Sequence, residues 1–178
     1  MSKQVISNRG RQSGAVLIVS LLLLLVLTVL GVVMMQTTRM QERMAGATRD
    51  LNMALQGAES GLRYGESVVA AYTALPDTSG TLPCLVCQKG TLPIAIYDPA
   101  QFNWGTNAQT YGQAGLTGTT ALAVAPQYTT EDLGFIPDSL DSGQEVPDGR
   151  DFFQISALST GASGLATTVL QSTYARRF

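Results

Sequence analysis

The pattern of hydrophobic and polar positions divides the chain into an apolar run, an amphipathic stretch and a region of shorter elements. Residues 15–35 contain no charged side chain and are apolar at nearly every position. An α-helix rises about 1.5 Å per residue, so this run would extend roughly 30 Å, the thickness of the hydrocarbon core of a bilayer. The pattern therefore predicts a membrane-spanning helix over residues 15–35.

The helical pattern continues beyond Met35, but it becomes amphipathic. Apolar or small residues recur at steps of three and four from Met40 to Tyr72, with polar residues between them. This spacing is typical of a helix that packs one face on a domain. Pro76 marks its limit, because the residue before a proline is pushed out of the helical region. We therefore predict an amphipathic helix half over residues 36–73.

Three glycines, Gly57, Gly61 and Gly65, recur at intervals of four in this second half. Each costs about 1 kcal/mol of helix propensity relative to alanine, so we expect a packing reason for them. The favoured interpretation is a flat groove that lets a β-sheet approach the helix closely. The alternative is close contact between helices, as small residues provide between membrane helices.

The remaining residues, 74–178, are predicted to form a head with an irregular connection and a C-terminal sheet. Turn residues dominate the connection, which leaves room for short strands at residues 94–97 and 121–124. Strand-like composition is clearest at residues 127–131, 152–158 and 166–174. A glycine-containing turn joins the last two as an antiparallel hairpin. The predicted fold class is α+β, a long helix packed on a small antiparallel sheet.

The segment before the apolar run is short and basic, with Lys3, Arg9 and Arg11 but no acidic residue, and it ends at Gly14. An ordinary signal peptide has an apolar region of about 7 to 15 residues followed by a small-residue cleavage site. Here the small residue comes before the apolar run, and bulky residues follow it. The apolar run is therefore expected to stay in the mature protein.

Three segments resemble the PilX branch of the type IV minor pilins. They are Gly14-Ala-Val-Leu-Ile-Val-Ser-Leu21, Gln41-Glu-Arg-Met-Ala-Gly46 and Gln171-Ser-Thr-Tyr-Ala-Arg-Arg-Phe178. The resemblance implies a type IV pilin-like fold and a leader, residues 1–14, that prepilin peptidase removes between Gly14 and Ala15. It also implies N-methylation of Ala15. The chain would cross the inner membrane once with a periplasmic head, and would later reach the cell surface in the pilus.

The chain departs from the general pilin pattern at Val19. Most pilins carry a glutamate five residues into the mature chain, where it pairs with the N-terminal ammonium of a neighbouring subunit. A subunit without it is suited to be first in the filament, so we expect a place at or near the tip. The tip pseudopilin of type II secretion shares this feature. The simpler interpretation is that valine suits lipid, because a charge there costs about 2.5–3.5 kcal/mol.

The resemblance implies a minor pilin that initiates pilus assembly and supports twitching motility and adhesion. Its expected partners are other minor pilins, the major pilin, prepilin peptidase and the inner-membrane assembly machinery, with a tip adhesin as a further candidate. The alternatives are a type II secretion tip pseudopilin and an uncleaved signal-anchored periplasmic binding domain. Four charged residues beyond the membrane could set the register between neighbours, or simply be solvated: Arg39, Glu42, Arg43 and Asp50.

Cys84 and Cys87 form the only cysteine pair, which allows a structural disulfide, a redox site or half of a metal site. The metal interpretation is weakest, because the chain has no histidine and no second pair. A redox site is expected at a helix N-terminus, which Pro83 and the glycine-rich surroundings do not favour. A disulfide in an oxidising periplasm is the favoured interpretation.

An acidic loop offers weak calcium ligands in Asp138, Asp141 and Glu145. Their spacing does not fit an EF-hand, so a solvated loop is favoured. The net charge of −2 offers no basic face for nucleic acid. Without histidine the chain cannot form a Ser-His-Asp triad, and we expect neither an enzyme nor a cofactor.

Overall fold

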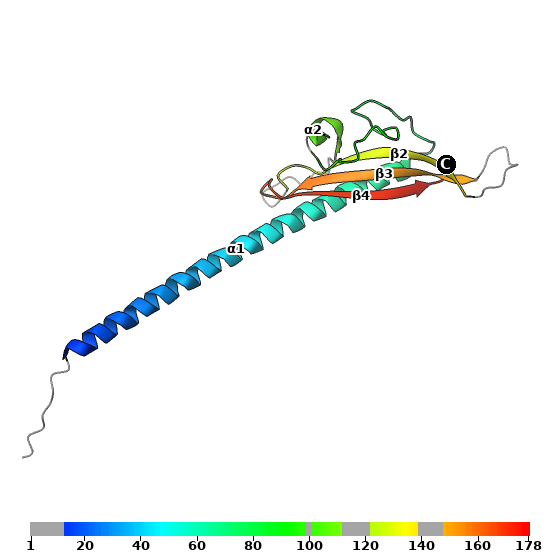
Figure 1. The fold of residues 1–178 in the computed structure, drawn as a ribbon. Coiled ribbons are helices and arrows are strands. Elements are labelled where there is room, and N and C mark those ends of the chain that lie inside the picture. Colours follow the sequence, from blue (N-terminus) through cyan, green and yellow to red (C-terminus); the bar gives the residue numbers. More distant parts are fainter. Residues whose placement is uncertain (1–12, 99–100, 112–121, 139–147) are drawn as a thin grey trace, which may run out of the picture. The chain divides into compact units, whose positions relative to one another are not determined.

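The structure is a computed structural model that describes residues 13–98, 101–111, 122–138 and 148–178. It contains two compact units that divide between Gly46 and Ala47. Each is described by itself. The elements (Figure 1) are α1 (Ser13–Ala71), α2 (Trp104–Asn107), β1 (Gln109–Thr110), β2 (Gln127–Pro137), β3 (Gly149–Thr160) and β4 (Thr167–Arg176).

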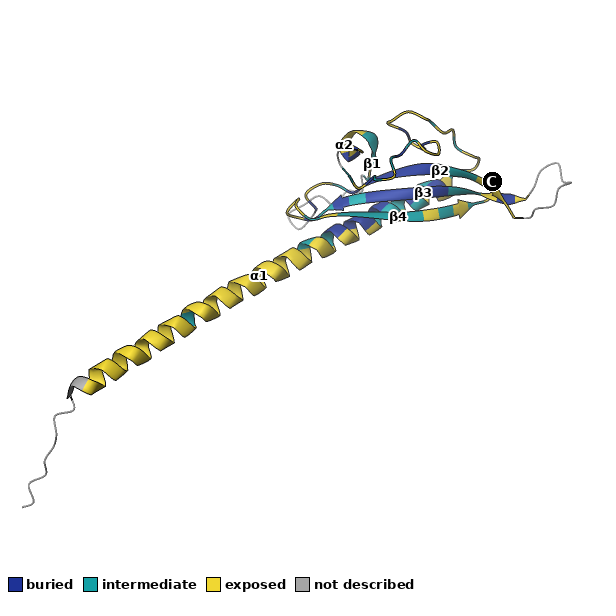
Figure 2. Ribbon diagram, viewed as in Figure 1, coloured by how far each residue is buried: buried dark blue, intermediate teal, exposed yellow. Residues whose placement is uncertain are grey.

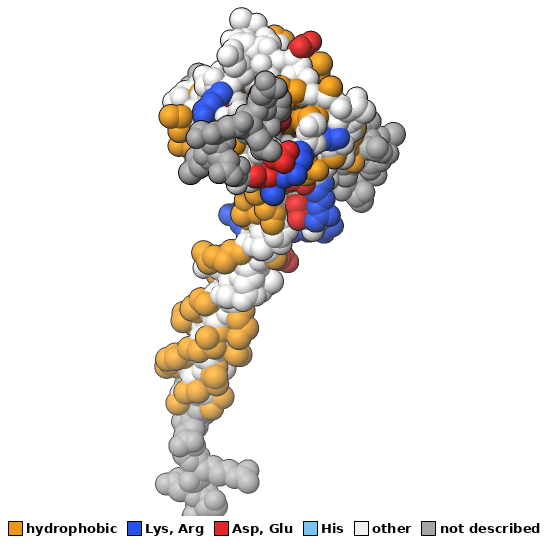
Figure 3. Space-filling view, turned by 90° about the vertical axis from the view of Figure 1, so that its right-hand side faces the viewer, with side chains coloured by type: hydrophobic (Ala, Val, Ile, Leu, Met, Phe, Trp, Pro, Cys, Tyr) orange, Lys and Arg blue, Asp and Glu red, His pale blue; other side chains and the backbone are white. Residues whose placement is uncertain are grey.

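The first unit consists of the N-terminal part of α1. Its large apolar side chains are exposed, which gives the yellow ribbon of Figure 2 and the orange side chains along the helix in Figure 3. By length and composition, α1 contains a segment able to cross a membrane. This agrees with the helix predicted from residue 15 onward.

The second unit is built on an antiparallel sheet with the strand order β1-β2-β3-β4. In its register, Thr130 of β2 faces Ile155 of β3, and Ile155 faces Ser172 of β4. The hairpin predicted from the last two strands is confirmed, because β3 and β4 pair from Thr160 opposite Thr167 to Asp151 opposite Arg176. The α+β fold class, a long helix packed on an antiparallel sheet, is also confirmed.

The two faces of the sheet are covered by different parts of the chain. Alternate residues of a strand point to opposite faces, and in β3 Phe153 and Ile155 pack with Val69 of α1. Leu158 of β3 and Val169 of β4 instead pack against a cluster from the irregular connection. That cluster consists of Cys84, Cys87, Leu92, Ile96, Phe102 and Trp104.

Three details of the prediction are wrong. Residues 94–97 form turns instead of a strand, because Ile96 is buried and its carbonyl accepts the Trp104 indole N–H at 2.9 Å, while Ile94 is fully exposed. Residues 122–124 form no strand either, and residue 121 lies outside the described residues. Finally, α1 ends at Ala71 instead of residue 73.

Candidate functional site

The junction expected for leader cleavage lies in the first turn of α1. Gly14 and Ala15 are both helical, and α1 begins at Ser13. Val19 follows one turn after Ala15, with 58% of its surface exposed. An aliphatic side chain at this position offers no group that could pair with an ammonium.

The hydroxyl side chains in and just after the apolar segment are bonded within the helix. The Ser20 hydroxyl donates to the Leu17 carbonyl at 2.9 Å, and the Thr28 hydroxyl donates to the Leu25 carbonyl at 2.8 Å. Thr37 and Thr38 donate in the same way to the carbonyls four residues earlier. These hydroxyls therefore need no partner from water or from another chain.

The apolar segment has no cover within its own unit. The large hydrophobic side chains from Val16 to Met35 are between 44% and 68% exposed. Burying one such side chain is worth about 1.5–3 kcal/mol, so the whole segment would release tens of kcal/mol on entering an apolar medium. The segment therefore requires lipid or the apolar surfaces of other chains.

The three glycines lie in the second unit, where α1 meets the sheet most closely. A Cβ placed on Gly57 would come within 2.7 Å of Leu122 Cδ1 and 3.0 Å of Ser159 Cβ. On Gly61 it would lie 3.2 Å from Pro126 Cβ, and on Gly65 it would lie 2.7 Å from Ile155 Cγ2. All three glycines therefore lie against the sheet or against the segment that leads into β2.

Asp50 fastens the turn between β3 and β4 to α1. Its carboxylate accepts the Ser163 N–H at 3.0 Å and also the Ser163 hydroxyl. Hydrogen bonds from the side chain and then the backbone of Ser163 hold the pKa of Asp50 below its usual range. Gly161 lies against the same carboxylate, because a Cβ there would come within 2.6 Å of Asp50 Cγ. The sequence carries no local signal for this partnership across 113 positions.

Two further polar contacts join α1 to β4. The Ser172 hydroxyl donates to Glu66 Oε1 at 2.7 Å, and the Arg176 guanidinium donates to the Val69 carbonyl at 2.6 Å. On the β2 side, Tyr128 packs edge-on against Tyr64, with ring centroids 5.5 Å apart. Burial raises the pKa of the Tyr128 phenol, which keeps it neutral as a packing group.

Cys84 and Cys87 form a disulfide. The Cys87 backbone also bonds β2: its N–H donates to the Thr130 carbonyl at 2.8 Å, and its carbonyl accepts the Asp132 N–H at 2.9 Å. Nearby, the Gly90 N–H donates to the buried Glu131 carboxylate at 2.6 Å. The disulfide segment is therefore part of the sheet's β2 edge, a role that the cysteine spacing alone did not indicate.

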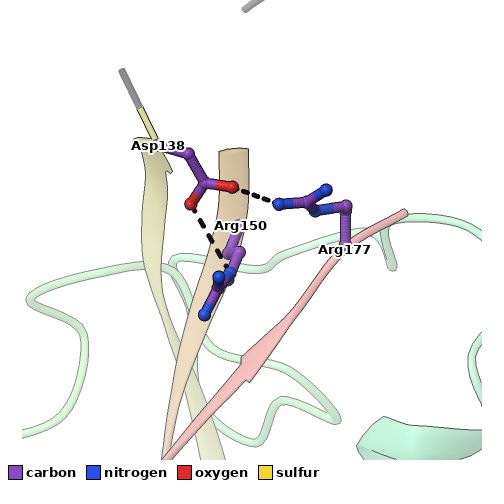
Figure 4. A network of polar contacts seen from close by, with 3 residues as sticks. All are labelled: Asp138, Arg150 and Arg177. Carbon is purple, nitrogen blue, oxygen red and sulfur yellow. Dashed lines mark hydrogen bonds and ion pairs between the residues drawn. The ribbon is translucent and has the colours of Figure 1, made fainter. Parts of the chain in front are cut away.

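Of the three weak calcium ligands, the structure describes only Asp138, since Asp141 and Glu145 lie outside the described residues. Asp138 is paired with two guanidinium groups, Arg150 at 3.5 Å and Arg177 (Figure 4). All three side chains are at least one-third exposed. Within the described ranges no three Cys, Asp or Glu side chains gather to hold a metal ion. The arrangement is a surface ion-pair network.

Comparison with known proteins places similarity along almost the entire chain. A family model described as PilX N-terminal matches residues 13–63, and one described as type IV pilus assembly protein PilX C-term matches residues 59–176. No curated protein and no solved structure matches the chain significantly. The two family matches meet within α1, so the helix and the head are covered together.

Proposed function

We propose that this chain, which belongs to the PilX family of type IV pilus proteins, is a minor pilin that primes pilus assembly at or near the filament tip. In this role it supports twitching motility and adhesion. The observation that carries the proposal is the apolar first part of α1, which has no cover in its own unit and no ionisable side chain from Ala15 to Met35.

The proposed mechanism rests on the transfer of this helix between two apolar media. Before assembly, the segment is stabilised in the inner membrane, because extraction into water would expose side chains worth about 1.5–3 kcal/mol each. A bundle of equivalent helices from other pilins offers the same burial. Since the hydroxyls of Ser20 and Thr28 already bond to their own helix, the transfer requires no new partner for these two side chains.

The tip position is proposed from Val19. A subunit joining an existing filament gains from a carboxylate that meets the N-terminal ammonium of the subunit ahead. A subunit that is placed first meets no such ammonium, and a buried unpaired carboxylate would be costly there. Valine at position 19 avoids that cost and suits a subunit that starts the filament.

The proposed partners are other minor pilins, the major pilin, prepilin peptidase and the inner-membrane assembly machinery, with a tip adhesin as a further candidate. The head would face the periplasm before assembly. We propose a structural role without catalysis or cofactor, in keeping with a family of structural pilus components.

The N-terminal mass of the membrane-extracted protein tests the proposal, measured with and without active prepilin peptidase. We expect the mature chain to begin at Ala15, with a methylated amine, only when the peptidase is active. A chain that keeps its leader in both strains would instead be an ordinary membrane-anchored protein.

Deletion of the protein then distinguishes a role in pilus assembly from a role in type II secretion. We expect the deletion to reduce surface piliation while protein export continues. Restoring the chain with Val19→Glu should recover fewer pili than the wild type, while Val19→Leu should recover them fully. Equal recovery by both variants would contradict the role given to position 19.

A further inference from the structure

The two edges of the sheet differ in their cover. On the β2 side, β1 pairs with Gln127 and Tyr128, and Cys87 forms a bridge to Glu131. On the other side β4 is the terminal strand, and among the described residues only β3 pairs with it. Figure 1 shows β4 (red) along this edge. Within the part of the chain that the structure describes, the outward backbone groups of this ten-residue strand therefore have no strand partner.

The hydrogen-bond pattern indicates which backbone groups point outward. The Gly161 N–H donates to the Ala166 carbonyl at 2.7 Å, which makes these residues a hydrogen-bonded pair. Such pairs alternate with non-hydrogen-bonded pairs in an antiparallel ladder. The N–H and C=O groups of every second β4 residue thus face away from β3: Thr167, Val169, Gln171, Thr173 and Ala175.

This edge lacks the features that keep edge strands from pairing. Soluble proteins protect long edges with lysine, proline, inward charges or bulges. From Thr167 to Ala175, β4 has no charged residue and no proline, and its register against β3 is regular throughout. By contrast, β2 contains a register shift between Asp132 and Gly134. The open edge of β4 is thus suited to main-chain pairing.

A groove follows the same edge on the face of the sheet turned away from α1. Its outer part, about 430 Å³, is lined by Thr167, Val169 and Gln171 of β4 together with Ile96 and Tyr97. Its inner part, about 380 Å³, shares Ile96 and Gln171 and continues to Gln154 and Glu131. A strand added to β4 would turn alternate side chains toward this groove.

Apolar side chains border the groove without covering it. Ile94 is fully exposed and Tyr97 is 71% exposed, although both belong to the turns that anchor Ile96 in the core. Exposed apolar residues that gather around a groove are typical of a protein-binding surface. They provide contact area for the side chains of an added strand.

We propose that β4 is a docking edge that binds an extended, uncharged segment of another pilus protein as an additional antiparallel or parallel strand. Main-chain hydrogen bonds to β4 give the affinity, and the groove beside Ile96 and Tyr97 selects the alternate side chains. Because the edge and the outer groove carry no charge, the fitting segment has small or β-branched neutral residues at alternate positions. This inference rests on the proposed function for the class of partner.

The test uses the full-length chain in piliated cells with Thr173→p-benzoylphenylalanine, a photo-crosslinker at an exposed, outward-facing β4 position. We expect an adduct whose crosslinked peptide, read by mass spectrometry, is an uncharged strand segment of a different pilin or tip protein. The absence of any adduct, or an adduct only with a second copy of this chain, would overturn the proposal.

A matched pair of variants at Gln171 tests whether pairing uses the backbone. Gln171→Ala and Gln171→Pro both remove the amide that donates to Ser156 at 3.0 Å, but only proline removes the outward N–H. We expect the alanine variant to keep the adduct and the proline variant to reduce it at least tenfold. An adduct of equal yield in both variants would overturn the proposal.

Gln171→Lys covers the case in which the proline variant fails to fold, because a lysine protects an edge without altering the ladder toward β3. It should reduce the adduct like proline while the Cys84–Cys87 disulfide still forms. The mass of the mature N-terminus and the number of pili are recorded in the same cells. If the chain is processed at Ala15 and pili still require it, but no adduct forms, the docking edge is refuted. The proposed function would not be affected by that result.

Discussion

Gly65 of α1 and Ile155 of β3 lie so close that a methyl group on the glycine would come within 2.7 Å of Ile155 Cγ2. Ile155 is fully buried and packs with Val69 of the same helix, so it has little room to move aside. The distance between helix and sheet is therefore set by the absence of a side chain at position 65.

Gly65→Ala is expected to destabilise the head. Alanine improves helix propensity by about 1 kcal/mol, but overpacking a tight site costs about 1–3 kcal/mol, so the net change is a loss of up to about 2 kcal/mol. Gly46→Ala is the matched control, because no atom lies within 4 Å of a Cβ there, and it should stabilise or leave stability unchanged. Thermal unfolding of the full chain in detergent would measure both variants. A Gly65→Ala protein as stable as Gly46→Ala would contradict the packing argument.

Asp50 should make the stability of the head sensitive to acid. Its pKa is lowered in the folded protein, chiefly by the Ser163 hydroxyl and then the Ser163 N–H. As the pH falls, the unfolded state therefore binds a proton at this carboxylate before the folded state does. The hydrogen bonds stabilise the folded protein fully above the unfolded pKa of about 3.9, and this stabilisation is lost as the pH falls through the lower pKa of the folded state. Melting temperatures between about pH 6 and pH 3 should fall more steeply for the wild type than for Asp50→Asn.

Ser163→Ala is the companion variant to Asp50→Asn. It removes the hydroxyl donor and keeps both the carboxylate and the backbone donor at position 163. Its acid sensitivity should lie between those of the wild type and Asp50→Asn. If all three proteins lose stability in parallel as the pH falls, the acid sensitivity arises from other groups.

Removal of the disulfide should weaken the head without unfolding it. The bridge closes a loop of only four residues, for which the chain-entropy model gives about 2 kcal/mol. The Cys87 backbone would still pair with Thr130 and Asp132 of β2. We expect Cys84→Ala/Cys87→Ala to have a lower melting temperature than the oxidised wild type and to match the wild type measured in reductant. Loss of cooperative unfolding would show that the bridge is needed for folding itself.

Calcium should have no effect on the stability of the protein. Two guanidinium groups, those of Arg150 and Arg177, already contact the Asp138 carboxylate, and they oppose the approach of a cation. Asp138→Asn should cost less than about 1 kcal/mol, as exposed ion pairs do. Melting temperatures in millimolar Ca²⁺ and in chelator should agree for both proteins. A rise with Ca²⁺ that is lost in Asp138→Asn would support a calcium site instead.

The elements that could be predicted from the sequence are those with a strong local period. The apolar run and the spacing of small residues predicted α1, and β-branched residues predicted the central parts of β2, β3 and β4. The prediction ended β2 at residue 131, whereas β2 continues to Pro137 across a register shift beside Gly134. Glycine and proline suggest a turn locally, yet pairing with β3 keeps this segment in the sheet.

The contacts that eluded prediction join distant positions. A short strand was predicted at residues 94–97, but the Trp104 indole N–H donates to the Ile96 carbonyl and the segment forms turns. Asp50 looked like a helix surface charge, while its partner Ser163 lies 113 residues later. The cysteine pair allowed three interpretations, of which a disulfide was favoured, but none of them showed that the Cys87 backbone extends the edge of β2. Such contacts depend on the folded topology and leave no periodic signal.

The hydroxyls of Ser20, Thr28, Thr37 and Thr38 all bond to carbonyls of their own helix. With these bonds the hydroxyl side chains in the first part of α1 are satisfied by their own helix. They keep the same bonds whether acyl chains or leucines surround the helix, so neither environment holds the helix through them. Movement in either direction, into a growing fibre or back on retraction, therefore breaks no hydrogen bond of these four side chains.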